Sequence, residues 1–190
     1  MNRIYISIVI LIMGLVPMKG FSQTEAEMKA WEAYMTPGEN HKMLAEETGT
    51  WDCEMSLWME PGGQPQKYKS VAEVKMVMGG RYQEGTYKGD MMGMPFEGKS
   101  TVAYNNASKE FISTFMDNMG TGLMVSTGTY DKATKTIKSK GEMVSPMDGK
   151  KVPYRENYIF VDKDTRKLEM FDTKNGKEYK SMEIIMKRRK

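Results

Sequence analysis

Apolar and polar residues alternate along the stretch that begins at Gly49-Thr50-Trp51. From Trp51 to Met59 every second residue is apolar, and the residues between them are polar as far as Trp58. A period of two is the signature of a β-strand with one buried face. Gly49 allows the chain to turn sharply into this segment. The stretch therefore predicts the first strand of a sheet.

Segments with the same alternation recur along the rest of the chain, and turn signals separate them. Pro61-Gly62-Gly63 closes the first segment, and Asn175-Gly176 is a strong signal for a tight hairpin. The later predicted strands span residues 72–78, 81–88, 96–104, 110–116, 123–130, 137–143, 152–161, 167–172 and 179–187. No helical pattern interrupts this series after residue 48.

About ten short strands in simple succession indicate an all-β domain, either an up-and-down antiparallel barrel or a sandwich. The barrel is the better prediction because closure leaves no long unpaired edge. A closed barrel of this size can also enclose one small ligand. We therefore expect residues 49–190 to form the barrel domain.

Two short helices are expected ahead of the barrel, within residues 23–48. Thr24-Glu25-Ala26-Glu27 has the form of a capping box, and a helix should follow it to about Met35. Met28, Trp31 and Met35 then fall on one apolar stripe. Thr36-Pro37-Gly38-Glu39 repeats the start signal with proline at the first helical position, which predicts a second helix over residues 41–47.

The first 22 residues have the organisation of a cleaved secretory signal. Asn2-Arg3 gives a short positive start, residues 4–16 are almost wholly apolar, and Gly20-Phe21-Ser22 places small residues before the expected cleavage site. The apolar run is shorter than the ~20 residues of a comfortable bilayer span, so an uncleaved anchor is the less favoured alternative. We expect an exported protein, secreted or periplasmic, without a membrane span after cleavage.

The charge balance argues against a polyanionic partner. The chain carries 28 Lys and Arg against 25 Asp and Glu, and the predicted signal accounts for two of the basic residues, Arg3 and Lys19. A nucleic-acid-binding surface needs a clear basic excess, so no nucleic-acid partner is expected.

Cys53, the one cysteine, falls on the apolar side of its strand, which indicates a buried and inert thiol. The sequence does not indicate an oligomeric state.

The entry into the first strand resembles that of the lipocalin and calycin barrels. Gly49-Thr50-Trp51 follows a short helix, and Arg188 or Arg189 lies near the end of the last strand. In those barrels the tryptophan closes one end and an arginine stacks across it. The resemblance therefore implies that Trp51 and Arg188 close the barrel, and a guanidinium over an indole face is a favourable cation–π contact.

A second resemblance covers most of the chain after the predicted signal. The order of local motifs is similar to that of a bacterial family known as domain of unknown function 1579, which implies an exported calycin-like barrel without an established activity. The related haem-binding nitrobindin-type barrels use a late histidine, and no histidine follows His41 here, so we expect no haem and no other cofactor. The matching motifs are Glu39-Asn40-His41-Lys42-Met43-Leu44, Gly49-Thr50-Trp51, Met78-Gly79-Gly80-Arg81, Gly93-Met94-Pro95-Phe96-Glu97-Gly98, Tyr104-Asn105 and Asp117-Asn118-Met119-Gly120-Thr121-Gly122.

Five residues are candidates for contact with a ligand. Arg81 and Arg155 can grip a carboxylate, because a planar guanidinium binds it in a bidentate manner. Tyr104 and Tyr158 are expected to line the pocket, and Met94 is expected to add an adaptable apolar contact. The alternatives are a surface or end-closing role for the arginines and simple core packing for the tyrosines.

His41 and the methionines raise two further possibilities. His41 is the only histidine and could serve as a general base, although a packing role on its helix is the alternative. The chain has 21 methionines, and Met91-Met92-Gly93-Met94 with Met116 and Met119 would suit copper(I), because thioethers are soft ligands. Methionine also fills irregular gaps in cores, so no metal site is assigned.

Together these patterns predict an exported barrel that binds a small apolar or amphipathic molecule. Three alternatives remain open at this stage. They are an enzyme of undetermined class acting at the barrel mouth through His41 or a buried carboxylate, a periplasmic copper(I)-binding protein, and an interaction module with a solid core. The volume and lining of the barrel interior distinguish them.

Overall fold

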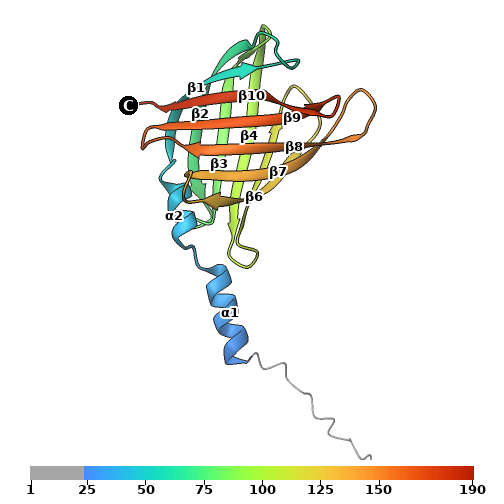
Figure 1. Ribbon diagram of the computed structural model, residues 1–190. Coiled ribbons are helices and arrows are strands. Elements are labelled where there is room, and N and C mark those ends of the chain that lie inside the picture. Colours follow the sequence, from blue (N-terminus) through green and yellow to red (C-terminus); the bar gives the residue numbers. More distant parts are fainter. Residues whose placement is uncertain (1–23) are drawn as a thin grey trace, which may run out of the picture.

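The computed structural model describes residues 24–190, and the predicted signal segment at 1–22 lies outside them. Ten antiparallel strands form a closed barrel, in which each strand pairs with its neighbours in sequence and β1 pairs with β10 (Figure 1). The predicted up-and-down barrel is confirmed, and the sandwich is excluded. The strands are β1 (Gly49–Leu57), β2 (Gln66–Val77), β3 (Tyr82–Met91), β4 (Met94–Asn105), β5 (Glu110–Asp117), β6 (Met124–Asp131), β7 (Thr136–Val144), β8 (Lys151–Phe160), β9 (Thr165–Lys174) and β10 (Lys177–Arg188).

The strands follow the period-two pattern that predicted them. In β1, Trp51 and Cys53 are buried and face the interior, whereas Asp52 and Glu54 are exposed. The β9–β10 turn at Asn175-Gly176 has φ values of 54° and 74°, and positive φ at both positions is what a two-residue type I′ hairpin requires.

Strand β2 begins well before the predicted position at residue 72. Its first half, from Gln66, holds lysines on the outer face and a polar serine, Ser70, on the inner face. An inward serine interrupts the apolar alternation, so the sequence pattern hides this part of the strand. Pairing with β1 across its whole length, from Gly49 opposite Val74 to Leu57 opposite Gln66, holds the segment in the sheet.

Helix α1 (Glu25–Met35) begins with the predicted capping box. The Thr24 hydroxyl accepts a hydrogen bond from Glu27 N, and the Glu27 carboxylate accepts one from Thr24 N. The helix extends away from the barrel in Figure 1 and buries none of its residues, so the stripe that includes Trp31 stays exposed. Asn106 Nδ2, in the β4–β5 turn, donates to the carbonyl oxygens of Ala33, Tyr34 and Thr36 at the end of the helix.

Helix α2 (Glu39–Ala45) lies two residues earlier than the predicted range of 41–47, and it does not use the predicted start signal at Thr36. Its N-cap is Gly38, whereas Thr36 is the C-cap of α1 and Pro37 precedes the new cap. The physical reason lies in His41, whose Nδ1 accepts a hydrogen bond from Gly38 N at 3.0 Å. The imidazole thus takes the place that a Glu or Gln usually has in a capping box.

Helix α2 covers one end of the barrel, near β2, β3 and β4. Leu44 is 1% exposed and packs with the inward residues Phe111 and Ile137. A second buried cluster forms around Trp51 with Met186. These two clusters fill the helix-covered end of the barrel, which we call the floor. Across residues 24–190, no helix has both the length and the apolar character needed to cross a membrane.

Candidate ligand-binding cavity

Above the floor the barrel encloses a cavity of about 520 Å³. Inward residues of all ten strands line it, and Leu44 and Glu47 contribute from the segment around α2. The volume lies within the range of roughly 300–1,000 Å³ that small-molecule sites have. Of the alternatives left open by the sequence, the solid core is therefore ruled out.

The floor contains a buried ion pair between Glu47 and Arg166. Arg166 Nε donates to Glu47 Oε1 at 2.7 Å, and the two side chains are only 3% and 4% exposed. Tyr158 donates its hydroxyl proton to the same carboxylate oxygen, and Gln83 Nε2 donates to Oε2 at 3.0 Å. With these three donors the buried carboxylate is well satisfied, as a buried charge must be. The sequence analysis did not single out this pair.

Trp51 connects the floor to the segment that enters β1 and to the end of β10. Its side chain is fully buried, and its indole N–H donates to Glu47 O at 2.8 Å. The guanidinium carbon of Arg188 lies 4.3 Å from the indole centroid, and that of Arg166 lies 5.4 Å from it. Arg188 also donates to the carbonyl oxygens of Thr48 and Glu46, so it holds the entry into β1 against the end of β10.

The walls of the cavity are rich in methionine. Thioether side chains are flexible and polarisable, so a wall made of them can adapt to ligands of different shape. Phe96, Phe111 and Phe115 provide rigid aromatic surface between them. The lining methionines among the described residues are Met55, Met59, Met91, Met124, Met143, Met170, Met182 and Met186.

The mouth lies opposite the floor, where the β1–β2, β3–β4, β5–β6, β7–β8 and β9–β10 turns come together. Large apolar side chains are exposed around this end, among them Met147, which is 91% exposed. An apolar ring of this kind gives an apolar molecule a path into the cavity. The other exposed members are Met59, Met92, Met94, Met119 and Leu123.

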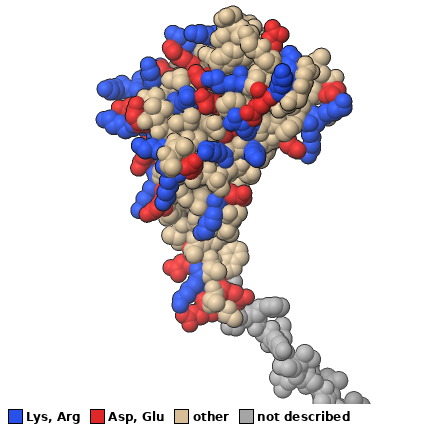
Figure 2. Space-filling view, in the orientation of Figure 1, with Lys and Arg blue, Asp and Glu red and all other residues tan. Residues whose placement is uncertain are grey.

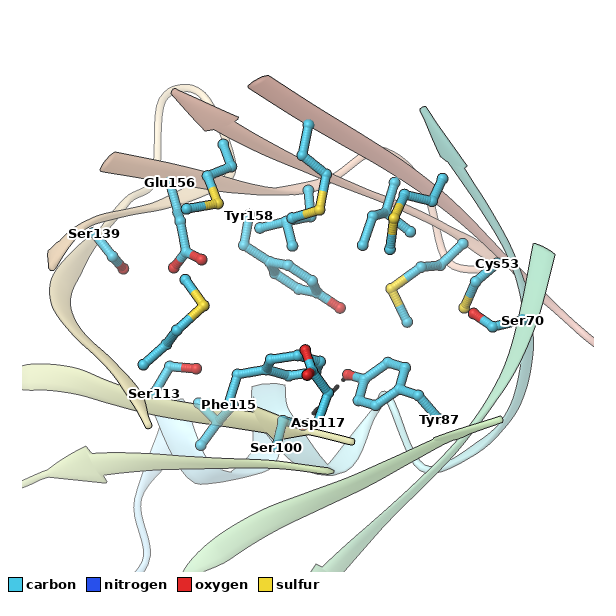
Figure 3. A pocket seen from close by; sticks show the side chains of 18 of the residues that line it. Cys53, Ser70, Tyr87, Ser100, Ser113, Phe115, Asp117, Ser139, Glu156 and Tyr158 are labelled. Carbon is cyan, nitrogen blue, oxygen red and sulfur yellow. Dashed lines mark hydrogen bonds between the residues drawn. The ribbon is translucent and has the colours of Figure 1, made fainter. Parts of the chain in front are cut away.

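A small number of polar groups point into the apolar space, as Figure 3 shows. Glu156 and Tyr158 approach from one wall, and Tyr87 and Ser100 approach from the facing wall. The hydroxyl oxygens of Tyr87 and Ser100 lie 3.3 Å apart. Burial raises the pKa of Tyr87 to about 12, so its phenol stays protonated and can serve as a neutral hydrogen-bond partner.

Cys53 lines the cavity as a buried thiol. Burial raises its pKa to about 11, although hydrogen bonds with Ser70 and Ala72 oppose the shift. At neutral pH the thiolate is therefore a very small fraction, and the side chain acts as a small apolar group. This agrees with the inert thiol that the strand pattern indicated.

Two of the residues singled out as ligand contacts lie inside the barrel, but only one reaches the cavity. Tyr158 lines it, with its hydroxyl held by Glu47. Tyr104 packs against the floor, and its ring meets His41 edge-on with the centroids 5.8 Å apart. Its ring also packs against Phe111, which lines the cavity, whereas Tyr104 is absent from the lining.

The structure places the other three outside the cavity. Arg81 lies exposed in the β2–β3 turn, where Nη1 donates to Met78 O at 3.2 Å. Arg155 lies on the outer face of β8, stacked 3.6 Å above the Phe171 ring and paired with Glu178. Met94 is 49% exposed at the mouth and is absent from the lining. Neither guanidinium is therefore positioned to receive a carboxylate inside the barrel.

His41 and the methionine run are also not gathered at one site. His41 is 5% exposed beneath Tyr104, and burial lowers its pKa, which favours the neutral ring that caps α2. Met91 lines the cavity, whereas Met92 and Met94 are exposed at the mouth. Within residues 24–190, His, Cys, Asp and Glu side chains form no group of three or more that could hold a metal ion.

The outer surface carries charges of both signs. Figure 2 shows Lys and Arg interspersed with Asp and Glu over the visible face of the barrel. Several are paired across neighbouring strands, such as Lys88 with Glu97 and Lys151 with Glu142. This face presents no single-sign patch of the kind that attracts a polyanion.

Most of the sequence that forms the helices and the barrel is matched by one family model. The model described as protein of unknown function (DUF1579) matches residues 36–188. The chain belongs to this family. Among curated proteins, none matches the chain in sequence.

Two solved structures share the fold of this DUF1579 protein. The crystal structure of Rv2717c from M. tuberculosis has a TM-score of 0.60 and 14% identity, and the match covers 82% of this chain and 100% of that one. The S-type phycobiliprotein lyase CPES from Guillardia theta has a TM-score of 0.56 and 12% identity, with 85% and 97% covered. At these identities the likeness shows the fold alone, and it confirms the lipocalin-like barrel expected from Gly49-Thr50-Trp51.

Proposed function

We propose that this DUF1579 protein binds a small, largely apolar molecule inside its barrel and that it does so after export. The observation that carries the proposal is the cavity of about 520 Å³, lined mainly by apolar side chains and open at one end. The export part rests on the apolar segment at residues 4–16 and the small residues that follow it.

The cavity favours such a ligand energetically. Burial of apolar surface contributes about 25 cal/mol per Å², so a ligand that buries about 300 Å² gains about 7.5 kcal/mol before the costs of association. Met170 and Met182 can adjust to its shape, and the rings of Phe96 and Phe115 give it rigid surface. Tyr87 and Tyr158 orient any polar end of the molecule.

The proposal is tested with N-phenyl-1-naphthylamine, a neutral apolar fluorophore that brightens on leaving water. Saturable binding of one molecule per chain is expected. Ser113 lines the cavity, and the neighbouring Thr114 is absent from the lining and alternates to the outer face. Ser113→Trp should weaken binding by at least about tenfold because the indole fills ligand space, whereas Thr114→Trp should leave it unchanged. Absence of saturable binding by the wild type would refute the proposal.

A further inference from the structure

The charged side chains that line the cavity are all acidic. Among its lining residues in 24–190 there is no Lys, Arg or His. Of these four acidic groups, Glu47 alone has a cationic partner, Arg166. Asp117 Oδ1 accepts a hydrogen bond from Met119 N in the turn that follows its strand. Glu156 and Asp172 lie on the neighbouring strands β8 and β9 and face the ligand space without a cation.

Glu156 reaches into the cavity from β8 and has only a weak partner. Its Oε2 accepts a hydrogen bond from the Ser126 hydroxyl at 3.0 Å. Burial raises its pKa, and the Ser126 hydrogen bond offsets this only in part. A neutral hydroxyl compensates a buried carboxylate far less than a cation does. The Glu156 carboxyl group can therefore accept a further hydrogen bond from a stronger, charged donor.

Asp172 carries a buried oxygen that lacks any partner. Its Oδ1 is the one buried side-chain oxygen or nitrogen within residues 24–190 that accepts no hydrogen bond. The nearby Ser181 hydroxyl has a single proton, which it donates to Met170 O at 3.3 Å. Burial raises the pKa of Asp172, and the Ser181 hydroxyl beside the carboxyl group opposes this shift only in part. An unpaired buried acceptor is rare in native structures and calls for a physical reason.

The two carboxyl groups belong to one patch of the wall. Glu156 stands opposite Met170 in the β8–β9 pairing, and Asp172 lies on the same face of β9, nearer the mouth. Such diagonal neighbours lie roughly 7 Å apart across a sheet, within reach of a single ligand group. The buried phenol of Tyr154 lies near both, since their charges add to burial in raising its pKa to about 12.

We propose that the apolar ligand carries a protonated amine and that Glu156 and Asp172 receive it. This inference rests on the proposed function and specifies the ligand class. An ammonium group supplies three N–H donors and a positive charge, which satisfies Asp172 Oδ1 and the free oxygen of Glu156. A carboxylate head would meet acidic groups without any basic residue in the lining, so fatty acids are disfavoured.

The test compares three twelve-carbon molecules that differ only in the head group. Dodecylamine, dodecanol and dodecanoate, each below its micelle concentration, compete with N-phenyl-1-naphthylamine at pH 7.5. Dodecylamine should displace the fluorophore at about tenfold lower concentration than dodecanol, and dodecanoate should be the weakest. Equal affinity of amine and alcohol, or tighter binding of dodecanoate, would overturn the inference while leaving the proposed function intact. Failure of the fluorophore and all three molecules to bind would overturn both.

Substitutions of the two cavity carboxyl groups test where the amine of the ligand binds. Glu156→Gln and Asp172→Asn should each weaken dodecylamine by about tenfold and leave dodecanol unchanged, since both changes keep the shape of the side chain. The matched control is Glu54→Gln, which removes an exposed carboxylate from the outer face of β1 and should alter neither ligand. Dodecanol binding reports that each variant is folded. An amine preference that survives both cavity variants would contradict the assignment.

Discussion

Glu47 and Arg166 form an ion pair at 2.7 Å in the barrel floor, with both side chains almost wholly buried. Glu47 lies between α2 and β1, and Arg166 lies near the start of β9. The pair thus joins the segment that enters the barrel to a strand that comes more than 100 residues later in the sequence. Because Tyr158 also donates to Glu47, the same pair fixes one wall of the cavity.

Removing one partner of this pair should destabilise the protein strongly. Arg166→Met leaves the Glu47 charge buried without its cation, and we expect a loss of about 3–5 kcal/mol in the free energy of unfolding. The measurement is urea denaturation at pH 7.5. The matched control is Arg155→Met, whose partner Glu178 is 48% exposed and whose loss should cost about 1 kcal/mol or less. Similar losses from the two variants would contradict the role given to the floor.

A side chain at Gly128 should also destabilise the barrel. A Cβ there would overlap the Lys138 carbonyl oxygen and the Ser139 hydroxyl on β7, and a backbone atom cannot move aside cheaply. We expect Gly128→Ala to cost about 1–3 kcal/mol in urea denaturation. Gly122→Ala serves as the control, because a Cβ at that position meets nothing within 4 Å. A neutral Gly128→Ala would show that β6 and β7 pair less closely than described.

The Cys53 thiol should be nearly unreactive in the folded protein. Its pKa of about 11 leaves a thiolate fraction of about one in a thousand at pH 8, against about one in four for an ordinary cysteine of pKa 8.5. Reaction with 5,5′-dithiobis(2-nitrobenzoic acid) should therefore be at least about 100-fold slower in the native state than in urea. A native rate that equals the rate in urea would contradict the buried position.

The cavity carboxyl groups should lower stability at neutral pH. Burial raises the pKa of Glu156, so over the pH range between its unfolded and folded values the folded protein holds the proton that the unfolded chain releases. Stability therefore falls as pH rises through that range. Glu156→Gln should raise the Tm at pH 7.5 by roughly 2–4 °C, which corresponds to about 1 kcal/mol.

That gain should vanish near pH 4, where Glu156 is protonated in the folded state and largely so in the unfolded state. The charges of Glu156 and Asp172 both act on the buried phenol of Tyr154. The dependence of stability on pH therefore reflects these coupled groups and not Glu156 alone. Thermal scans at the two pH values make the measurement, with Glu54→Gln as the unaffected control. A variant that is less stable than the wild type at pH 7.5 would contradict the assignment.

The barrel itself could be predicted from sequence because its signals are local. Inward residues such as Trp51 and Cys53 alternate with outward charges, and hairpin residues such as Asn175-Gly176 mark the turns. The N-cap of α2 was misplaced because the imidazole of His41, three residues after Gly38, completes the capping box where the pattern looks for a carboxylate or amide.

The candidate site was harder to predict because it depends on strand parity and on distant pairings. Tyr158 and Arg155 are an odd number of residues apart on one strand, so they cannot face the same side; the same parity rule puts Glu156 beside Tyr158 inside the barrel. That signal was available in the sequence. The meeting of Glu156 with Asp172, and of Glu47 with Arg166, depends on the β8–β9 register and the closure of the barrel, which no local pattern encodes.

The most direct test of the central claim is a crystal structure determined under xenon pressure. Xenon enters apolar cavities without requiring a known ligand. We predict xenon density inside the barrel, among the side chains of Met170, Phe111 and Phe115. A structure in which side chains fill that space and exclude xenon would contradict the account.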